Sequence, residues 1–89
     1  MKITTWNVNS INARIGHLLK LIKQDQSDIY LLQELKCIGD AFPYKEIEKL
    51  GYNCYVNGQK AWNVVAILSK IKLNIINCLY YYFIRIWWL

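Results

Sequence analysis

The sequence predicts an α/β fold made of one β-α-β unit followed by a β-hairpin. The first observation is a pair of short strand-like runs, residues 2–6 and 28–32, which flank an amphipathic helical segment. Such a unit joins parallel strands through a right-handed crossover. The second is a further pair of strand-like runs, residues 52–56 and 64–68, separated by a polar loop. That arrangement is typical of an antiparallel hairpin with a long loop.

The first strand and the helix are indicated by their residue patterns. Residues 2–6 are rich in β-branched and aromatic side chains and end at the polar cluster 7–10, which indicates a strand and a turn. Apolar side chains then recur with the period of an α-helix, at Ile11, Ile15, Leu18, Leu19 and Ile22. We expect a helix here with Ser10 as its N-cap.

The remaining elements follow from turn residues and apolar runs. Residues 28–32 form a continuous apolar run after a polar break, which is typical of a strand buried on both faces. Pro43 opens a second helix over residues 44–50, and Gly51 occupies the expected C′ position. Residues 71–89 contain no Gly or Pro and keep neither period, so we expect them to form an apolar and aromatic tail outside a domain of residues 1–70.

Composition excludes several classes of protein. A chain of 89 residues that is 55% hydrophobic, with one Pro and four Gly, is one small globular domain and not a disordered segment. The net charge is +5, and no acidic residue follows Glu48, so the excess positive charge lies in residues 49–89. A basic segment of this kind is compatible with binding to nucleic acid.

The sequence also indicates a cytoplasmic location. The N-terminus lacks the apolar core of a signal peptide. The apolar run from Leu73 contains Asn74, Asn77 and Arg85, so we expect no stable membrane span, although a membrane-interface or partner-facing role for this tail is an alternative. The cysteines are few and widely spaced, which predicts free thiols in a reducing compartment: Cys37, Cys54 and Cys78.

Polar side chains follow both strands of the predicted β-α-β unit. Asn7 and Asn9 follow the first strand, and Gln33, Glu34 and Lys36 follow the second. Because ligands bind at the carboxyl ends of strands in open α/β sheets, these side chains form a candidate site. Carboxylate and amide oxygens suit Mg²⁺, and the lysine could pair with the carboxylate or with a phosphate. A turn-forming asparagine and a solvated glutamate are the alternatives.

Several segments, in order, resemble the exodeoxyribonuclease III family of the endonuclease/exonuclease/phosphatase superfamily. They are residues 5–11 with 13–14, residues 28 and 33–36, Phe42-Pro43, residues 50–52, residues 58–60 and residues 63–69. The resemblance implies part of a four-layer α/β sandwich. It also implies Mg²⁺-dependent hydrolysis of phosphodiesters in double-stranded DNA, with Mn²⁺ as a substitute. The implied activities are 3′–5′ exonuclease and abasic-site endonuclease, in base excision repair.

The resemblance also implies roles for individual residues. In the family, the glutamate matching Glu34 binds the metal, and the asparagine matching Asn7 supports the metal and its waters. The surrounding polar network would contain Asn9, Gln33 and Lys36. Candidate DNA contacts are Arg14, Gln59 and Lys60.

The sequence departs from the family pattern at several positions. Asn12 replaces an arginine, Leu35 replaces a threonine, and Ala61 and Val64 stand where glycines are common. The later family motifs, which supply the catalytic groups, have no match after Ser69, so no catalytic residue is identified. We therefore predict a truncated nuclease domain that is inactive alone. The alternatives are a small basic nucleic-acid-binding module and a non-nuclease phosphatase of the same superfamily. Exposed sheet edges could cause oligomerisation or aggregation.

Overall fold

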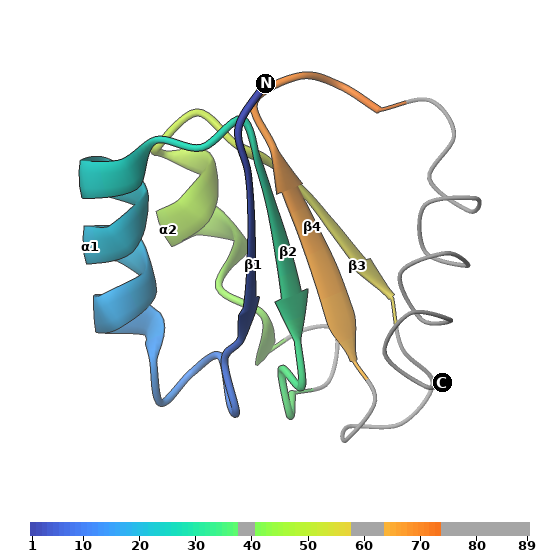
Figure 1. Cartoon of the computed structure of the whole chain (residues 1–89). Coiled ribbons are helices and arrows are strands. Elements are labelled where there is room, and N and C mark those ends of the chain that lie inside the picture. Colours follow the sequence, from blue (N-terminus) through green and yellow to red (C-terminus); the bar gives the residue numbers. More distant parts are fainter. Residues whose placement is uncertain (38–40, 58–63, 74–89) are drawn as a thin grey trace.

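The computed structural model describes residues 1–37, 41–57 and 64–73. Figure 1 shows a sheet with two helices on one of its faces. In chain order the elements are β1 (Ile3–Asn7), α1 (Ile15–Asp25), β2 (Ile29–Gln33), α2 (Tyr44–Glu48), β3 (Asn53–Asn57) and β4 (Val65–Ser69). The predicted α/β class and the predicted order of elements are confirmed.

The strand order in the described sheet is β1-β2-β4-β3. β1 and β2 are parallel, with Ile3 opposite Ile29 and Asn7 opposite Gln33, as predicted for the β-α-β unit. β3 and β4 are antiparallel, which confirms the hairpin, and β4 also pairs antiparallel with β2. In Figure 1 the arrowheads of β1 and β2 lie at the same edge of the sheet. The two segments that carry the predicted site therefore leave the sheet side by side.

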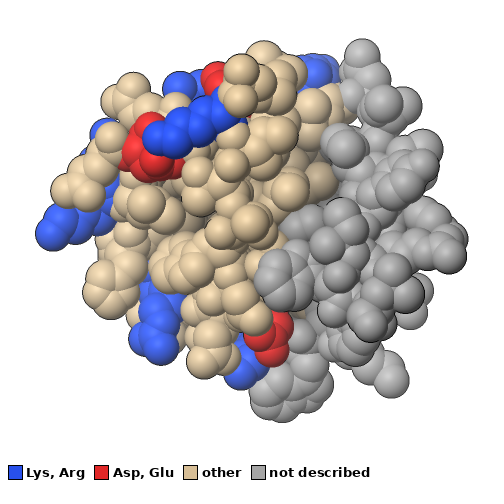
Figure 2. All heavy atoms as spheres, in the orientation of Figure 1, with Lys and Arg blue, Asp and Glu red and all other residues tan. Residues whose placement is uncertain are grey.

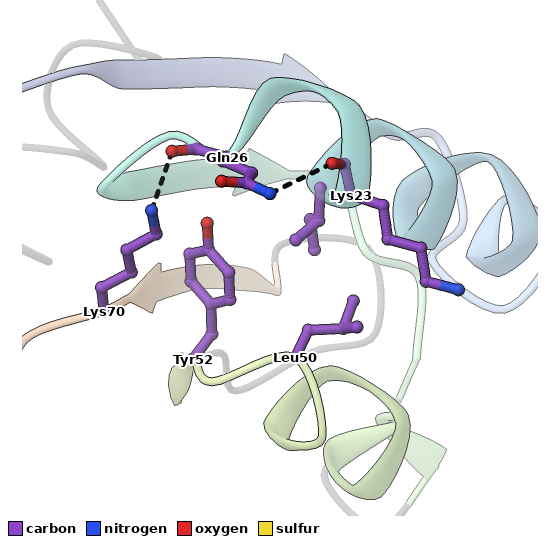
Figure 3. Close-up of a pocket in the computed structure, with 6 residues that line it drawn as sticks. Lys23, Gln26, Leu50, Tyr52 and Lys70 are labelled. Carbon is purple, nitrogen blue, oxygen red and sulfur yellow. Dashed lines mark hydrogen bonds between the residues drawn. The ribbon is translucent and has the colours of Figure 1, made fainter.

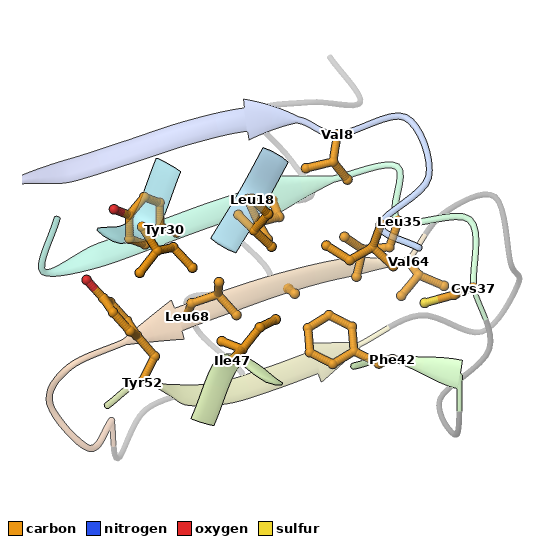
Figure 4. Packing of buried hydrophobic residues seen from close by; sticks show 14 residues of the cluster. Val8, Leu18, Tyr30, Leu35, Cys37, Phe42, Ile47, Tyr52, Val64 and Leu68 are labelled. Atoms are coloured by element: carbon orange, nitrogen blue, oxygen red, sulfur yellow. The ribbon is translucent and has the colours of Figure 1, made fainter. Parts of the chain in front are cut away.

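Both helices pack on one face of the sheet, and α1 does so with the apolar face predicted from its periodicity. Within α1, Leu18 and Ile22 are buried, while Lys20 and Lys23 are exposed. Figure 4 shows Tyr30 and Tyr52 at one end of the core and Leu35, Val64 and Cys37 at the other. The buried cluster contains Val8, Ile11, Leu18, Ile22, Tyr30, Leu32, Leu35, Cys37, Phe42, Ile47, Tyr52, Val64, Ala66 and Leu68.

The opposite face of the sheet carries a second apolar cluster. Val65 and Ile67 are buried there, with Ile29, Leu31, Tyr55 and Leu73 packed against them. Every residue of β4 is buried, which fits its central position between β2 and β3. Of the predicted tail, only residues 71–73 are described, so its separation from the domain stays a prediction.

Two predicted helix boundaries are wrong. The structure places the N-cap of α1 at Arg14 and not at Ser10, because residues 11–14 form a turn in which the Arg14 N–H contacts the carbonyls of Ser10 and Ile11. Ile11 is nevertheless fully buried, so periodicity predicted its burial correctly. The C-cap of α2 is Lys49, so Gly51 lies two residues beyond it; this glycine has φ +90° and donates its N–H to the Glu48 carbonyl.

The described residues contain no helix that is long and apolar enough to cross a membrane. Within the same residues, Cys37 and Cys54 are free thiols, as predicted, while Cys78 lies outside them. Burial raises the pKa of both thiols, to about 12 for Cys54. Raised pKa values favour the protonated thiol over the nucleophilic thiolate.

Candidate metal centre

The segments that follow β1 and β2 remain hydrogen-bonded to each other beyond the strands. The N–H groups of the first segment donate to the carbonyls of the second: Val8 to Gln33 (3.1 Å), Ser10 to Glu34 (2.9 Å) and Ile11 to Leu35 (2.8 Å). The Leu35 N–H in turn donates to the Val64 carbonyl at 3.1 Å. The segment after β2 is thus held on both sides, by the segment after β1 and by Val64.

This pairing holds unusual backbone conformations. Left-handed φ angles occur at Asn9 (47°), Ser10 (89°), Glu34 (52°) and Lys36 (51°). Such angles are rare for residues with a side chain and cost energy, so they persist only where surrounding contacts impose them. Leu35 lies between Glu34 and Lys36 and is fully buried. Its burial, together with the paired backbone, supplies the constraint that keeps its two polar neighbours in place.

The predicted site residues meet at this edge of the sheet. Asn7 donates from Nδ2 to Oε2 of Glu34. Oδ1 of Asn7 accepts the backbone N–H of Asn9 at 3.2 Å. The Lys36 ammonium donates to Oδ1 of Asn9. Asn7, Glu34, Asn9 and Lys36 therefore belong to one chain of hydrogen bonds.

Gln33 is the buried member of the site, with 3% of its surface exposed. Its Nε2 donates to Oγ1 of Thr5 at 2.7 Å and to the Leu31 carbonyl at 3.0 Å. Its Oε1 is buried and has no hydrogen-bond partner among the described residues. The predicted DNA contact Arg14 is exposed and precedes α1, and Gln59 and Lys60 lie outside the described residues.

These residues fit a hydrated divalent cation. Glu34 offers an exposed carboxylate, and Gln33 offers a buried acceptor that lacks a donor. Mg²⁺ binds through one or two carboxylates and keeps several waters, which can donate hydrogen bonds to nearby acceptors. The part of the chain that the structure describes holds no cluster of three or more His, Cys, Asp or Glu side chains. A cation here would therefore use one carboxylate and amide oxygens.

A second polar cluster, which sequence reasoning missed, lies at the opposite end of β1 and β2. The Asp25 carboxylate forms an ion pair with Lys2 and accepts hydrogen bonds from the hydroxyls of Thr4, Ser27 and Tyr30. The hydrogen bond from Lys2, followed by that from Ser27, holds the pKa of this carboxyl well below its usual range. The donors lie in or next to β1 (Lys2 and Thr4), in the loop after α1 (Ser27) and in β2 (Tyr30), so the cluster links the end of α1 to both strands.

A pocket of about 440 Å³ lies beside this cluster and is lined by Ile22, Lys23, Gln26, Leu50, Tyr52 and Lys70 (Figure 3). The side chains of Gln26, Tyr52 and Lys70 all donate hydrogen bonds to backbone carbonyls. The Lys70 ammonium donates to the Gln26 carbonyl at 3.0 Å, and the Tyr52 hydroxyl donates to the Ser27 carbonyl at 2.5 Å. Burial raises the pKa of Tyr52 to about 12. The hydrogen bonds of these lining residues connect the end of α1 to Tyr52 and to Lys70, which follows β4. We therefore interpret the pocket as a structural feature and not as the candidate site.

Charge on the visible surface is dispersed. Figure 2 shows the Lys and Arg side chains of the described residues spread around this face and not gathered in one patch. The candidate site is thus distinguished by its hydrogen-bonded carboxylate and amides, and not by a concentration of positive charge.

Comparison with known proteins agrees with this geometry. The model of the endonuclease/exonuclease/phosphatase family matches residues 4–89. Exodeoxyribonuclease III of Haemophilus influenzae is 40% identical over 76 residues, which cover 85% of this chain and 28% of that protein.

Two solved structures are similar in both fold and sequence. A 3′ phosphatase from Neisseria, bound to a product DNA hairpin, has a TM-score of 0.74 and 47% identity, covering 79% of this chain and 27% of that one. An AP endonuclease from Archaeoglobus fulgidus has a TM-score of 0.76 and 36% identity, covering 81% and 28%. The chain thus spans little more than a quarter of the length of these proteins. Its sheet, its paired strand ends and the matched sequence together place this chain in the endonuclease/exonuclease/phosphatase family.

Proposed function

We propose that Asn7 and Glu34 bind a divalent cation, Mg²⁺ or Mn²⁺, in the hydrolytic site of a nuclease that acts on double-stranded DNA. The observation that carries this proposal is the hydrogen bond between the two side chains at the carboxyl ends of adjacent parallel strands. It is supported by family membership and by similarity to an exodeoxyribonuclease III and an AP endonuclease.

Each side chain of the network has a distinct task. Glu34 presents the carboxylate, and Asn7 fixes its orientation by donating from Nδ2. The backbone of Asn9 fixes Asn7, and Lys36 places a positive charge beside Asn9. When bound, the cation would neutralise phosphate charge and stabilise the leaving oxygen. Arg14, Gln59 and Lys60 would contribute contacts to backbone phosphates.

A second candidate activity is hydrolysis of a terminal 3′ phosphate on DNA. The observation that favours it is the 47% identity with the Neisseria 3′ phosphatase, whose structure contains a product DNA hairpin. A phosphate monoester and a phosphodiester both present non-bridging oxygens to a cation, so the same site would serve either substrate. An oligonucleotide duplex with a 3′ phosphate, compared with an abasic-site duplex and a 3′-hydroxyl duplex, distinguishes the two activities.

We further propose that residues 1–89 alone do not turn over DNA. All six acidic residues lie between positions 25 and 48, and the matched region is 28% of the Haemophilus relative. The remaining catalytic groups would come from a longer polypeptide. The free thiols of Cys37 and Cys54 support a reducing setting.

The test uses two proteins: the 89-residue chain, and a chimera in which residues 1–73 replace the matching part of Haemophilus exodeoxyribonuclease III. We expect no turnover by the chain and Mg²⁺-dependent turnover by the chimera. Glu34→Ala should reduce turnover by about 100-fold or more, because it removes an electrostatic group from the site. Glu46→Ala, on the exposed side of α2, is the matched control. A chimera equally active with Glu34→Ala would contradict the metal site, and turnover by the chain alone would contradict its inactivity.

A further inference from the structure

Gln33 combines burial with an unused hydrogen-bonding group. Both of its Nε2 contacts are made within the sheet, to Oγ1 of Thr5 and to the carbonyl of Leu31. Its Oε1 has no hydrogen-bond partner among the described residues, although only 3% of the surface of Gln33 is exposed. Leaving a buried acceptor without a donor costs about 1–3 kcal/mol. An apolar side chain of similar length would avoid that cost.

The position of Gln33 relates this acceptor to the candidate metal centre. Gln33 lies opposite Asn7 in the sheet register and immediately precedes Glu34. Strands in a sheet lie about 4.8 Å apart, and directly paired residues project from the same face, so the side chains of Gln33 and Asn7 leave the sheet on the same face. The carbonyl of Gln33 also accepts the Val8 N–H at 3.1 Å. Side chain and backbone of Gln33 thus both hold the strand ends that present Asn7 and Glu34.

We propose that Gln33 is a positioning residue for the metal centre, whose Oε1 accepts a hydrogen bond from a water molecule of the bound cation. This inference rests on the proposed function. Waters bound to a cation act as hydrogen-bond donors, and Mg²⁺ keeps several of them in protein sites. The carboxamide suits this role because its NH₂ group is already held by Thr5 and Leu31, which orients the oxygen. Without the cation, Oε1 of Gln33 has no hydrogen-bond donor. When the cation binds, one of its water molecules supplies that donor.

The experiment measures Mn²⁺ binding to the full 89-residue chain, from the electron paramagnetic resonance signal of the free ion. Gln33→Met keeps the length of the side chain and removes its polar atoms. We expect it to weaken Mn²⁺ binding by about 10-fold to 100-fold, which is the usual effect of losing a group that supports the metal ligands. Its midpoint of urea unfolding should change little, because the loss of the two Nε2 hydrogen bonds offsets the removal of an unpaired acceptor. Gln24→Met, on the exposed face of α1, is the matched control.

The outcomes separate this inference from the proposed function. Mn²⁺ affinity of Gln33→Met within twofold of wild type, with binding lost in Glu34→Ala, overturns the role of Gln33 alone. Absence of Mn²⁺ binding to the wild-type chain overturns the metal centre and the role of Gln33 together.

A measurement without mutation covers the case in which Gln33→Met does not fold. The side-chain amide resonances of Gln33 and Gln24 are followed by NMR as Mg²⁺ is added to the wild-type chain. The Gln33 resonances should shift with saturable dependence on Mg²⁺, while those of Gln24 stay in place. Unchanged Gln33 resonances at Mg²⁺ concentrations that shift the Glu34 backbone amide would overturn the proposal.

Discussion

Replacing Leu35 with alanine tests how the site is held, because this side chain lies between Glu34 and Lys36. Leu35 is fully buried in the core cluster, where it lies near Val64 (Figure 4). The substitution removes three carbon atoms. At about 0.8 kcal/mol for each buried methylene, the loss of transfer free energy is about 2.4 kcal/mol. A cavity left behind adds to this, and the usual total for such a change is about 2–5 kcal/mol.

The expected result is a large fall in the free energy of unfolding. A domain of this length has about 4–13 kcal/mol of stability, taking about 0.05–0.15 kcal/mol per residue. Leu35→Ala should therefore lower the urea midpoint strongly, measured by circular dichroism. Ile3→Ala is the matched control, because Ile3 is 56% exposed, and it should change stability by about 0.5 kcal/mol or less. A cost below about 1 kcal/mol for Leu35→Ala would refute the inference that packing of Leu35 anchors the site.

Two further predictions concern the polar cluster and the turn after α2. Because the pKa of Asp25 is lowered from its ordinary value of 3.8, its contribution to stability is present above about pH 4 and is lost as the pH falls through the lower folded-state value. Asp25→Asn should therefore flatten the fall in unfolding midpoint between about pH 4 and pH 2, and an unchanged slope would contradict this. Gly51→Ala should destabilise the protein by about 1 kcal/mol because φ is +90°, although nothing lies within 4 Å of the added Cβ. Gly16→Ala, in α1 with the same free space, should stabilise it by about 0.5–1 kcal/mol, and equal effects of the two substitutions by thermal unfolding would argue against backbone strain at Gly51.

Much of the candidate site could be predicted from the sequence because it depends on local order and topology. A strand, an amphipathic helix and a second strand in succession imply parallel pairing, and parallel pairing brings two carboxyl ends together. The hydrogen bond between Asn7 and Glu34 follows from that arrangement. The roles of Gln59 and Lys60 stay predictions, because both residues lie outside the described part of the chain.

Other features depend on contacts between distant residues, which no local pattern contains. Ser10 has the composition of an N-cap, but its N–H pairs with the Glu34 carbonyl, and this contact places it in the extended pairing between the two strand ends. From the sequence, Asp25 is one residue of a polar break between two elements. Its hydrogen bonds with the hydroxyls of Thr4 and Tyr30 are visible only in the structure. Gln33 looks like a surface residue at a strand end, yet it is buried.

The sequence by itself determined the α/β class, the order of the elements, the parallel β-α-β unit and the placing of Asn7 and Glu34 at the same edge of the sheet. Those features follow from hydrophobic period, turn residues and chain connectivity, which are properties of neighbouring residues. Only the tertiary structure decided the central position of β4, the left-handed backbone at Glu34 and the unpaired oxygen of Gln33. Burial and hydrogen bonding at these positions are set by residues that lie far away in the chain and meet only when the sheet forms.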